Sequence, residues 1–227
     1  MMAPKLLTLV RHGEAEHNVG RRHHLPDTSL TSRGESQCRG LPDRFPQSPE
    51  ITLLVSSPLR RTLQTTLLGF PTQAAQLGIE VLPELQECSG MPCDTGTARE
   101  VLEADEMFRG ISFARCVEGW NSKKGEWGTD SATLKERARR ARCWLKEREE
   151  SHVVAVLHGA FLHFLTEDWT GDGSQAGTGW ANTEFRSYTF AEGEGTDAIV
   201  ETEESKARRV PHPLGQTELM ELEQIKN

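Results

Sequence analysis

The chain has 227 residues, of which 36% are hydrophobic and 26% charged, and its formal net charge is -8 at pH 7. This composition is typical of a folded globular protein and excludes a long disordered chain, while the length fits one large α/β domain. The negative charge argues against nucleic acid as a partner. It also repels polyanions, so a phosphate site would have to gather its positive charge locally.

Membrane and secretion signals are missing from the sequence. No apolar run approaches the roughly 20 residues that a transmembrane helix needs, and Met1 to Val10 lacks the pattern of a secretory signal peptide. We therefore expect no membrane partner and a cytoplasmic location, with the nucleus as an alternative. Nothing in the sequence indicates an oligomeric state.

The five cysteines are odd in number and have no framework spacing, which indicates reduced thiols. Cys88 and Cys93 could serve as metal ligands, but no second ligand pair accompanies them. We therefore predict no metal site.

Three short apolar runs predict buried parallel strands, and each run ends directly in polar residues. In open α/β sheets, ligands bind at the carboxyl ends of such strands, so these polar residues should meet at one edge. The runs are 5–10 before Arg11-His12-Gly13, 53–55 before Ser56-Ser57-Pro58, and 153–157 before His158-Gly159.

Helical patterns lie between these runs. Residues 31–39 and 60–68 each follow a start signal, with Pro58 just ahead of the second segment. Residues 132–148 give the clearest amphipathic pattern, with Asp130 or Ser131 as its cap. Its apolar face holds Leu134, Ala138, Ala141 and Leu145, and its opposite face, interpreted as solvated, holds Lys135, Arg139, Arg142 and Lys146.

The remaining segments complete an α/β fold. Residues 184–190 alternate as a strand, and 198–202 could pair with them across a glycine-containing turn. We predict a three-layer α/β/α sandwich with a mainly parallel central sheet. One domain would span residues 1–203, followed by a charged C-terminal tail at 204–227. The apolar stretch 214–225 could dock on that domain as a short helix or stay mobile.

Phosphoryl transfer needs a particular set of groups, and the strand ends offer them. The reacting anion requires fixed cationic donors, a nucleophile in line with the leaving oxygen, and an acid that protonates that oxygen. Arginine guanidinium groups suit phosphate because their forked donors bind two oxygens. A histidine with a fixed tautomer can serve as the nucleophile. The predicted edge gathers Arg11, His12, one of Arg60 and Arg61, and His158.

With these residues in place, the chain resembles branch 1 of the histidine phosphatase superfamily, the phosphoglycerate mutase-like group. Four motifs occur in the family's order over about residues 6–190, most of the chain. They are Leu9-Val10-Arg11-His12-Gly13-Glu14 with Asn18, Ser57-Pro58-Leu59-Arg60-Arg61 with Gln64-Thr65, Leu85-Gln86-Glu87, and Val156-Leu157-His158-Gly159.

The resemblance implies roles for the matched residues. His12 would form the phosphohistidine, and Glu87 would protonate the leaving group and then activate water. The phosphoryl oxygens would be held by Arg11, Asn18, Arg61 and His158. The substrate would be a small phosphorylated molecule, with no cofactor and no metal ion.

Two titration expectations accompany these roles. Glu87 would need a pKa above the usual value of about 4.3, or an acidic working pH, to carry its proton. For His12 and His158 we expect pKa values in their ordinary range of roughly 6 to 7, and hence a bell-shaped pH profile.

Other residues have weaker claims on the site. Arg21, Arg22, His24 and Gly159 are possible substrate contacts, and the loops 20–29, 89–113 and 170–182 would form the pocket walls. The histidines His17, His23, His24, His152, His163 and His212 are interpreted as surface or packing residues, of which His23 and His24, next to Arg21 and Arg22, could also touch the substrate.

Two alternatives to a phosphatase stay open. A phosphoglycerate mutase would need basic groups for the substrate carboxylate, yet Cys88-Ser89-Gly90-Met91-Pro92 follows Glu87 and no basic residue appears before Arg99. The second alternative is a non-catalytic phosphate-recognition or protein-interaction module, which would gain nothing from a nucleophile and an acid.

Overall fold

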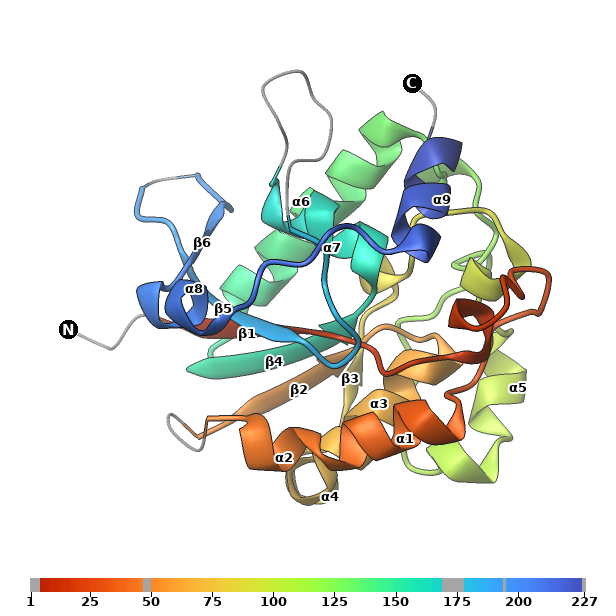
Figure 1. Cartoon of the computed structure of the whole chain (residues 1–227), viewed down its shortest axis with the longest axis horizontal. Coiled ribbons are helices and arrows are strands. Elements are labelled where there is room, and N and C mark those ends of the chain that lie inside the picture. Colours follow the sequence, from red (N-terminus) through yellow and green to blue (C-terminus); the bar gives the residue numbers. More distant parts are fainter. Residues whose placement is uncertain (1–4, 47–49, 169–177, 194, 226–227) are drawn as a thin grey trace.

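The computed structural model describes residues 5–46, 50–168, 178–193 and 195–225, and a mixed β-sheet forms its centre (Figure 1). Its strands are β1 (Leu6–Arg11), β2 (Leu53–Ser56), β3 (Glu80–Val81), β4 (His152–Leu157), β5 (Phe185–Phe190) and β6 (Ile199–Glu201). In the described residues the strand order is β3-β2-β4-β1-β5-β6. The first four strands are parallel, and β5 and β6 form an antiparallel edge.

Helices cover both faces of this sheet (Figure 1). One face packs under α1 (Ser32–Arg39), α2 (Leu41–Arg44), α3 (Arg60–Gly69) and α4 (Pro71–Leu77), and the other under α6 (Ser131–Glu147) and α7 (Gly159–Thr166). Two apolar cores result, because alternate residues of the central strands point to opposite faces. The predicted α/β/α sandwich with a mainly parallel sheet is confirmed.

Helix α8 (Glu203–Arg208) packs against β5, whereas α5 (Arg99–Glu103) and α9 (Gln216–Gln224) lie outside these layers. A third apolar cluster beside the sheet contains Phe108, Phe113, Trp120 and Trp127. Hydrophobic burial therefore continues through the long segment between β3 and α6, which carries little regular structure.

Local capping explains where the predicted helices begin. The Thr31 hydroxyl accepts a hydrogen bond from Gly34 N at 3.0 Å ahead of α1, and the Asp130 carboxylate accepts one from Thr133 N at 2.9 Å ahead of α6. Both are N-cap bonds that satisfy an otherwise unpaired backbone donor. The helices and the β5–β6 hairpin lie within a residue or two of their predicted bounds.

The prediction that α6 turns a solvated arginine face outward is wrong for Arg142. Its side chain is only 4% exposed, because it binds two carboxylates and two carbonyls at the end of α7 and in the β5–β6 connection. Its partners are Asp197, Glu167, Phe164 O and Leu165 O. The spacing of residues along α6 showed which of them share a face of the helix. It did not show that acidic residues from distant parts of the chain would cover Arg142.

The segment predicted as a charged tail contains two helices. The predicted boundary at residue 203 coincides with the start of α8, and beyond it α9 packs against α7. Glu218 and Glu221 on the inner side of α9 are 0% and 2% exposed. The stretch 214–225 is thus docked as a short helix, while the division of the chain at residue 203 stays a prediction.

Within the described ranges, no helix is both long and apolar enough to cross a membrane.

Replacement of Arg142 by Gln should lower the free energy of unfolding by about 2 kcal/mol, because partly buried carboxylates and carbonyls lose a shared donor. The matched control is Arg139→Gln on the same helix, since Arg139 is 51% exposed and its partners, Glu136 and Cys143 Sγ, lie on the surface of α6 itself. Urea unfolding of both variants measures the difference. Equal stability of the two variants would contradict this account.

Candidate active site

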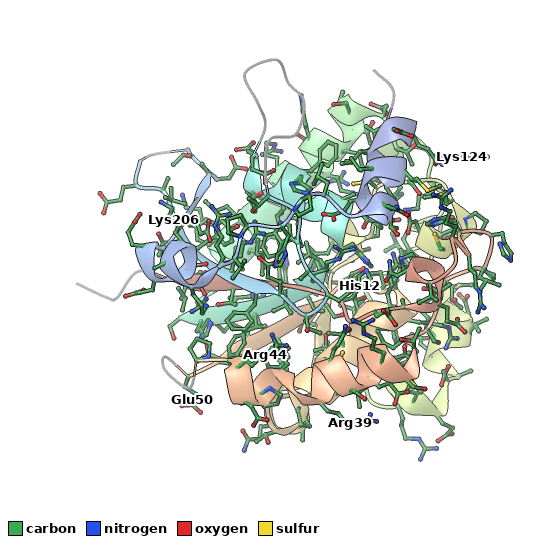
Figure 2. The ribbon with its side chains drawn as sticks, in the orientation of Figure 1. His12, Arg39, Arg44, Glu50, Lys124 and Lys206 are labelled. Carbon is green, nitrogen blue, oxygen red and sulfur yellow. The ribbon has the colours of Figure 1, made fainter. Side chains whose placement is uncertain are left out.

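The predicted strand ends meet at the carboxyl edge of the sheet. Val156 of β4 pairs with Val10 of β1 on one side and with Ser56 of β2 on the other, so the residues that follow the three strands leave the sheet together. The imidazole centroids of His12 and His158 are 5.3 Å apart. Figure 2 shows His12 near the middle of the molecule, where β1 ends.

His12 is held in one tautomer. Its Nδ1–H donates to Gly13 O at 2.7 Å, which leaves the lone pair on Nε2. Nε2 in turn accepts a hydrogen bond from Arg61 Nε at 3.3 Å. Burial, followed by the charges of Arg61 and Arg11, lowers the pKa of His12 well below its ordinary value. His12 is therefore a neutral imidazole whose free nitrogen faces a cation.

His158 presents the opposite nitrogen. Its Nε2 lies 2.8 Å from Ser57 Oγ, a hydroxyl that can either donate to or accept from the ring. Nδ1 is buried and has no hydrogen-bond partner among the described residues. Burial and the charge of Arg61 lower the pKa of His158 as well. The expectation of ordinary pKa values for both histidines is therefore wrong, because water is excluded and cations surround the rings.

Arg61 enters from the first turn of α3 and is fully engaged. It donates to Asp94 Oδ1 at 2.9 Å, to Cys93 O at 2.6 Å and to His12 Nε2. Both Arg61 and Asp94 have 0% exposed side chains. Burial alone would lower the pKa of Arg61, but the surrounding acidic groups, Asp94 first among them and Glu87 and Asp27 further away, together outweigh burial and raise the pKa. No motif in the sequence marks Asp94, which lies seven residues beyond Glu87.

Arg11 is held from one side only. Its Nη1 donates to Trp180 O and to Glu218 Oε2, the latter at 3.2 Å, whereas its buried Nε has no partner in the described part of the chain. Gly159 lies directly beneath it, since a Cβ there would be 3.0 Å from Arg11 Cζ. Gly159, predicted as a possible substrate contact, therefore provides the space in which the guanidinium group packs.

Glu87 lies at the amino end of α7. Its carboxylate accepts hydrogen bonds from Cys88 N and Phe161 N at 2.9 Å each and from Ala160 N at 3.3 Å. These bonds and Arg61 favour the ionised form, but burial, followed by the nearby Asp94, outweighs them and raises the pKa of Glu87. The direction is the one that an acid catalyst would need.

Asn18 serves the loop after β1. Its Oδ1 accepts from Ala15 N at 3.0 Å, and its Nδ2 donates to His17 Nε2 at 3.0 Å. His17 is 1% exposed, and its ring centroid is 5.7 Å from that of His12. His23 continues this row of rings at 6.2 Å from His17. His17 thus packs inside the site, and no spacing in the sequence distinguished it from a surface histidine.

Arg21, Arg22 and His24 are exposed, and the described contacts bring none of their side chains to His12. Their loop turns outward, with Arg21 itself at a φ of 54°. Of the third predicted wall, residues 170–177 lie outside the described residues, whereas Trp180 is buried beside Arg11.

Two further cations, both missed from the sequence, fix the segment that carries Glu87. Lys123 Nζ donates to Glu87 O at 2.8 Å, and Arg137 Nη2 donates to Gln86 O at 2.8 Å. Burial lowers the pKa of Lys123 to about 7 and that of Arg137 to about 10. Arg137 also lies 4.3 Å from the centre of the Phe161 ring. Both cations act on backbone carbonyls, so no periodic pattern marks them.

Glu221 of α9 adds another carboxyl group to the site. Burial, followed by the charges of Glu87 and Asp94, raises its pKa well above the ordinary value. Like Glu218, it comes from the C-terminal segment, far along the chain from the other motifs. No group of three or more His, Cys, Asp or Glu side chains suited to a metal ion occurs among the residues described.

A cavity of about 370 Å³ opens onto Arg11 and Asn18 from the surface. It lies between the start of α1, the loop around Trp180 and the first turn of α9. Its lining residues are Arg11, Asn18, Arg33, Gln37, 180–182 and 215–217. A hollow of about 460 Å³ elsewhere, lined by residues from α2 to α4, contains none of the predicted site residues.

His163, which was interpreted as a surface or packing residue, is a buried bridge. Its Nδ1 lies 2.9 Å from Asp168 and its Nε2 3.2 Å from Glu218. Burial alone would lower the pKa of His163, but the two carboxylates outweigh it and raise the pKa to about 9. Its protonated form is therefore the one that stabilises the fold.

Because the folded pKa of His163 lies above the unfolded value of about 6.5, its stabilisation is complete below that pH and is lost as the pH rises through about 9. At about 1.4 kcal/mol per pKa unit, the loss is about 3 kcal/mol. Lys123, whose pKa is lowered, makes the stability of the protein rise with pH instead. The effect of His163 is therefore taken from the difference in stability between the parent and His163→Gln. The stability difference between the two proteins should shrink from pH 6 to pH 9.5 in urea unfolding; a constant difference would contradict the assignment.

Comparison with known proteins places these features in context. A family model described as "Histidine phosphatase superfamily (branch 1)" matches residues 7–201. A Schizosaccharomyces pombe protein named "Probable phosphatase" is 28% identical over 168 residues, covering 71% of this chain and 77% of its own. A Proteus mirabilis protein named "Probable phosphoglycerate mutase GpmB" is 40% identical over 159 residues, covering 69% and 71%.

Solved structures with low sequence identity to this chain share its fold. The mycobacterial glucosyl-3-phosphoglycerate phosphatase superposes with a TM-score of 0.59 at 22% identity, covering 88% of this chain and 97% of its own. The alpha-ribazole phosphatase from Shigella flexneri gives a TM-score of 0.57 at 20% identity, covering 92% and 98%.

Proposed function

The chain belongs to branch 1 of the histidine phosphatase superfamily, and we propose that it hydrolyses small phosphomonoesters through a phosphohistidine on His12. The observation that carries this proposal is the contact between His12 Nε2 and Arg61 Nε at 3.3 Å, in a site that also contains Arg11 and His158. An unprotonated ring nitrogen beside three donors is the arrangement that attack on a phosphoryl group requires.

The reaction would proceed in two transfers. His12 Nε2 bonds to phosphorus while the bond from phosphorus to the alcohol oxygen breaks, and Glu87 gives its proton to that oxygen. Water then attacks phosphorus and returns a proton to Glu87, the bond from Nε2 to phosphorus breaks, and inorganic phosphate leaves. Arg61 would move its Nε–H from His12 to a phosphoryl oxygen, beside the unpaired donors of Arg11 and His158.

The charges around the site favour hydrolysis over a mutase reaction. A phosphoglycerate mutase has to bind a carboxylate in addition to the phosphoryl group. The site contains side chains that the sequence motifs did not mark. Three of them are acids, Asp94, Glu218 and Glu221, and Lys123 donates to a backbone carbonyl. A second anion on the substrate would meet buried carboxyl groups, which costs free energy. Isomerisation of 3-phosphoglycerate primed with bisphosphoglycerate would contradict this choice.

Replacement of His12 by Ala should abolish hydrolysis of p-nitrophenyl phosphate, with a loss on the order of 10³-fold or more in kcat, because the nucleophile is removed. Rapid quenching of the parent protein in alkali, followed by mass spectrometry, should locate one phosphoryl group on His12. Full turnover by the variant would disprove the mechanism. Phosphate binding by the parent without any turnover would favour the recognition module.

The role of Glu87 is tested by the leaving group. Glu87→Gln should slow hydrolysis of an alkyl phosphate by about 10²- to 10⁴-fold, the usual range for a general acid, and that of p-nitrophenyl phosphate much less, since nitrophenolate leaves without protonation. The activity of the parent on the alkyl ester should fall as the pH rises through the raised pKa of Glu87. If the variant slowed the hydrolysis of both esters equally, the proton would have to come from another group.

A further inference from the structure

We propose that Glu218 on the C-terminal helix α9 is a positioning residue, which holds Arg11 so that its Nε–H faces the phosphoryl group. This role rests on the proposed phosphatase function, because the rate of that reaction is what the experiment measures. It makes α9 a working part of the active site, although the motifs of the family all lie before it in the chain.

Three donors fix the carboxylate of Glu218. Oε2 accepts from Arg11 Nη1 at 3.2 Å and from Gly215 N at 2.9 Å, while Oε1 lies 3.2 Å from His163 Nε2. These donors come from β1, from the residue before α9, and from α7. With 0% exposure, the side chain has no water with which to exchange these bonds. The carboxylate therefore ties the C-terminal helix to the first strand through a rigid set of contacts.

The consequence for Arg11 is an oriented guanidinium group. Nη1 is occupied by Glu218 and by Trp180 O, and Nε is buried without a partner among the described residues. Because the guanidinium group is planar, fixing Nη1 on one edge also fixes the direction of the remaining donors. Those donors would otherwise have to be ordered when the substrate binds, at a cost in entropy.

Gly159 keeps the pair in place. A Cβ on this residue would lie 3.0 Å from both Arg11 Cζ and Glu218 Cγ, so the two side chains pack onto the bare backbone at the start of α7. Neither group can retreat towards α7. The arrangement is thus set by packing as well as by charge, which is what preorganisation of a transition-state donor requires.

A competing interpretation gives the opposite result. If Glu218 merely occupied Arg11 in place of the substrate, its removal would raise the affinity for phosphate and increase the rate. If Glu218 positions Arg11, its removal leaves a buried cation with half its partners, and the rate falls. The sign of the change separates the two interpretations.

The experiment compares glutamates of one helix. Glu218→Gln and Glu218→Ala should lower kcat/KM for p-nitrophenyl phosphate by about 10- to 100-fold, mainly in kcat, as expected for a misplaced donor. Glu223→Gln is the matched control, since Glu223 is exposed on α9, and it should stay within about twofold of the parent. Thermal unfolding of each variant shows whether the fold is intact, and Glu218→Gln preserves the side-chain volume if Glu218→Ala does not fold.

A double-mutant cycle distinguishes positioning from a purely structural role. In an Arg11→Ala background, Glu218→Gln should change kcat/KM by less than about threefold, because the group it positions is gone. Additive losses, a faster Glu218→Gln enzyme, or unchanged kcat/KM would each overturn the proposal. His12→Ala is assayed alongside: if it stays active, the phosphohistidine mechanism fails, and if it is inactive while Glu218→Gln behaves as the parent, only the role of Glu218 fails.

Discussion

The ion pair between Arg61 and Asp94 has no exposed side-chain surface, and the chemistry of the site depends on that exclusion of water. A buried guanidinium group is tolerated only when a carboxylate and carbonyls satisfy it. The same dry surroundings lower the pKa of His12 and raise that of Glu87, so the two groups shift in opposite directions. Such opposed shifts are the mark of acid–base catalysis on one fold.

The surroundings also show how a mildly acidic protein gathers several cations in one buried site. Each of the four cations has a carboxylate or carbonyl partner: Arg11 bonds to Glu218, Arg61 to Asp94, and Lys123 and Arg137 to the carbonyls of Glu87 and Gln86. Positive charge is not stored as a field over the surface. It lies inside the site, where Arg11 Nε and His158 Nδ1 are buried without a partner among the described residues, and in the proposed reaction these two groups would contact a phosphoryl oxygen.

The sheet and the three strand-end motifs could be predicted from the sequence, because short buried strands and their polar ends are local patterns, and the Glu87 segment could be predicted from the family resemblance. Residues that reach the site from other parts of the fold were not predicted. Asp94 ends a 3-10 helix, Arg137 lies on α6 between the apolar and the polar residues of the predicted pattern, and Glu218 belongs to the segment predicted as a tail. Each is defined by a tertiary contact that leaves no period in the sequence. The lowered pKa values of the histidines escaped for the same reason, since burial is a property of the whole fold.

The shared register of β1, β2 and β4 limits how this protein can change. Val156 faces both Val10 and Ser56, so inserting or deleting one residue in β4 would reverse the direction of every later side chain on that strand. The side chain that follows the strand, His158 in this protein, would then point away from His12. Length variation should accumulate in the connections that border the cavity, where new specificities can be built, whereas the three strands that end at the site have a fixed number of residues.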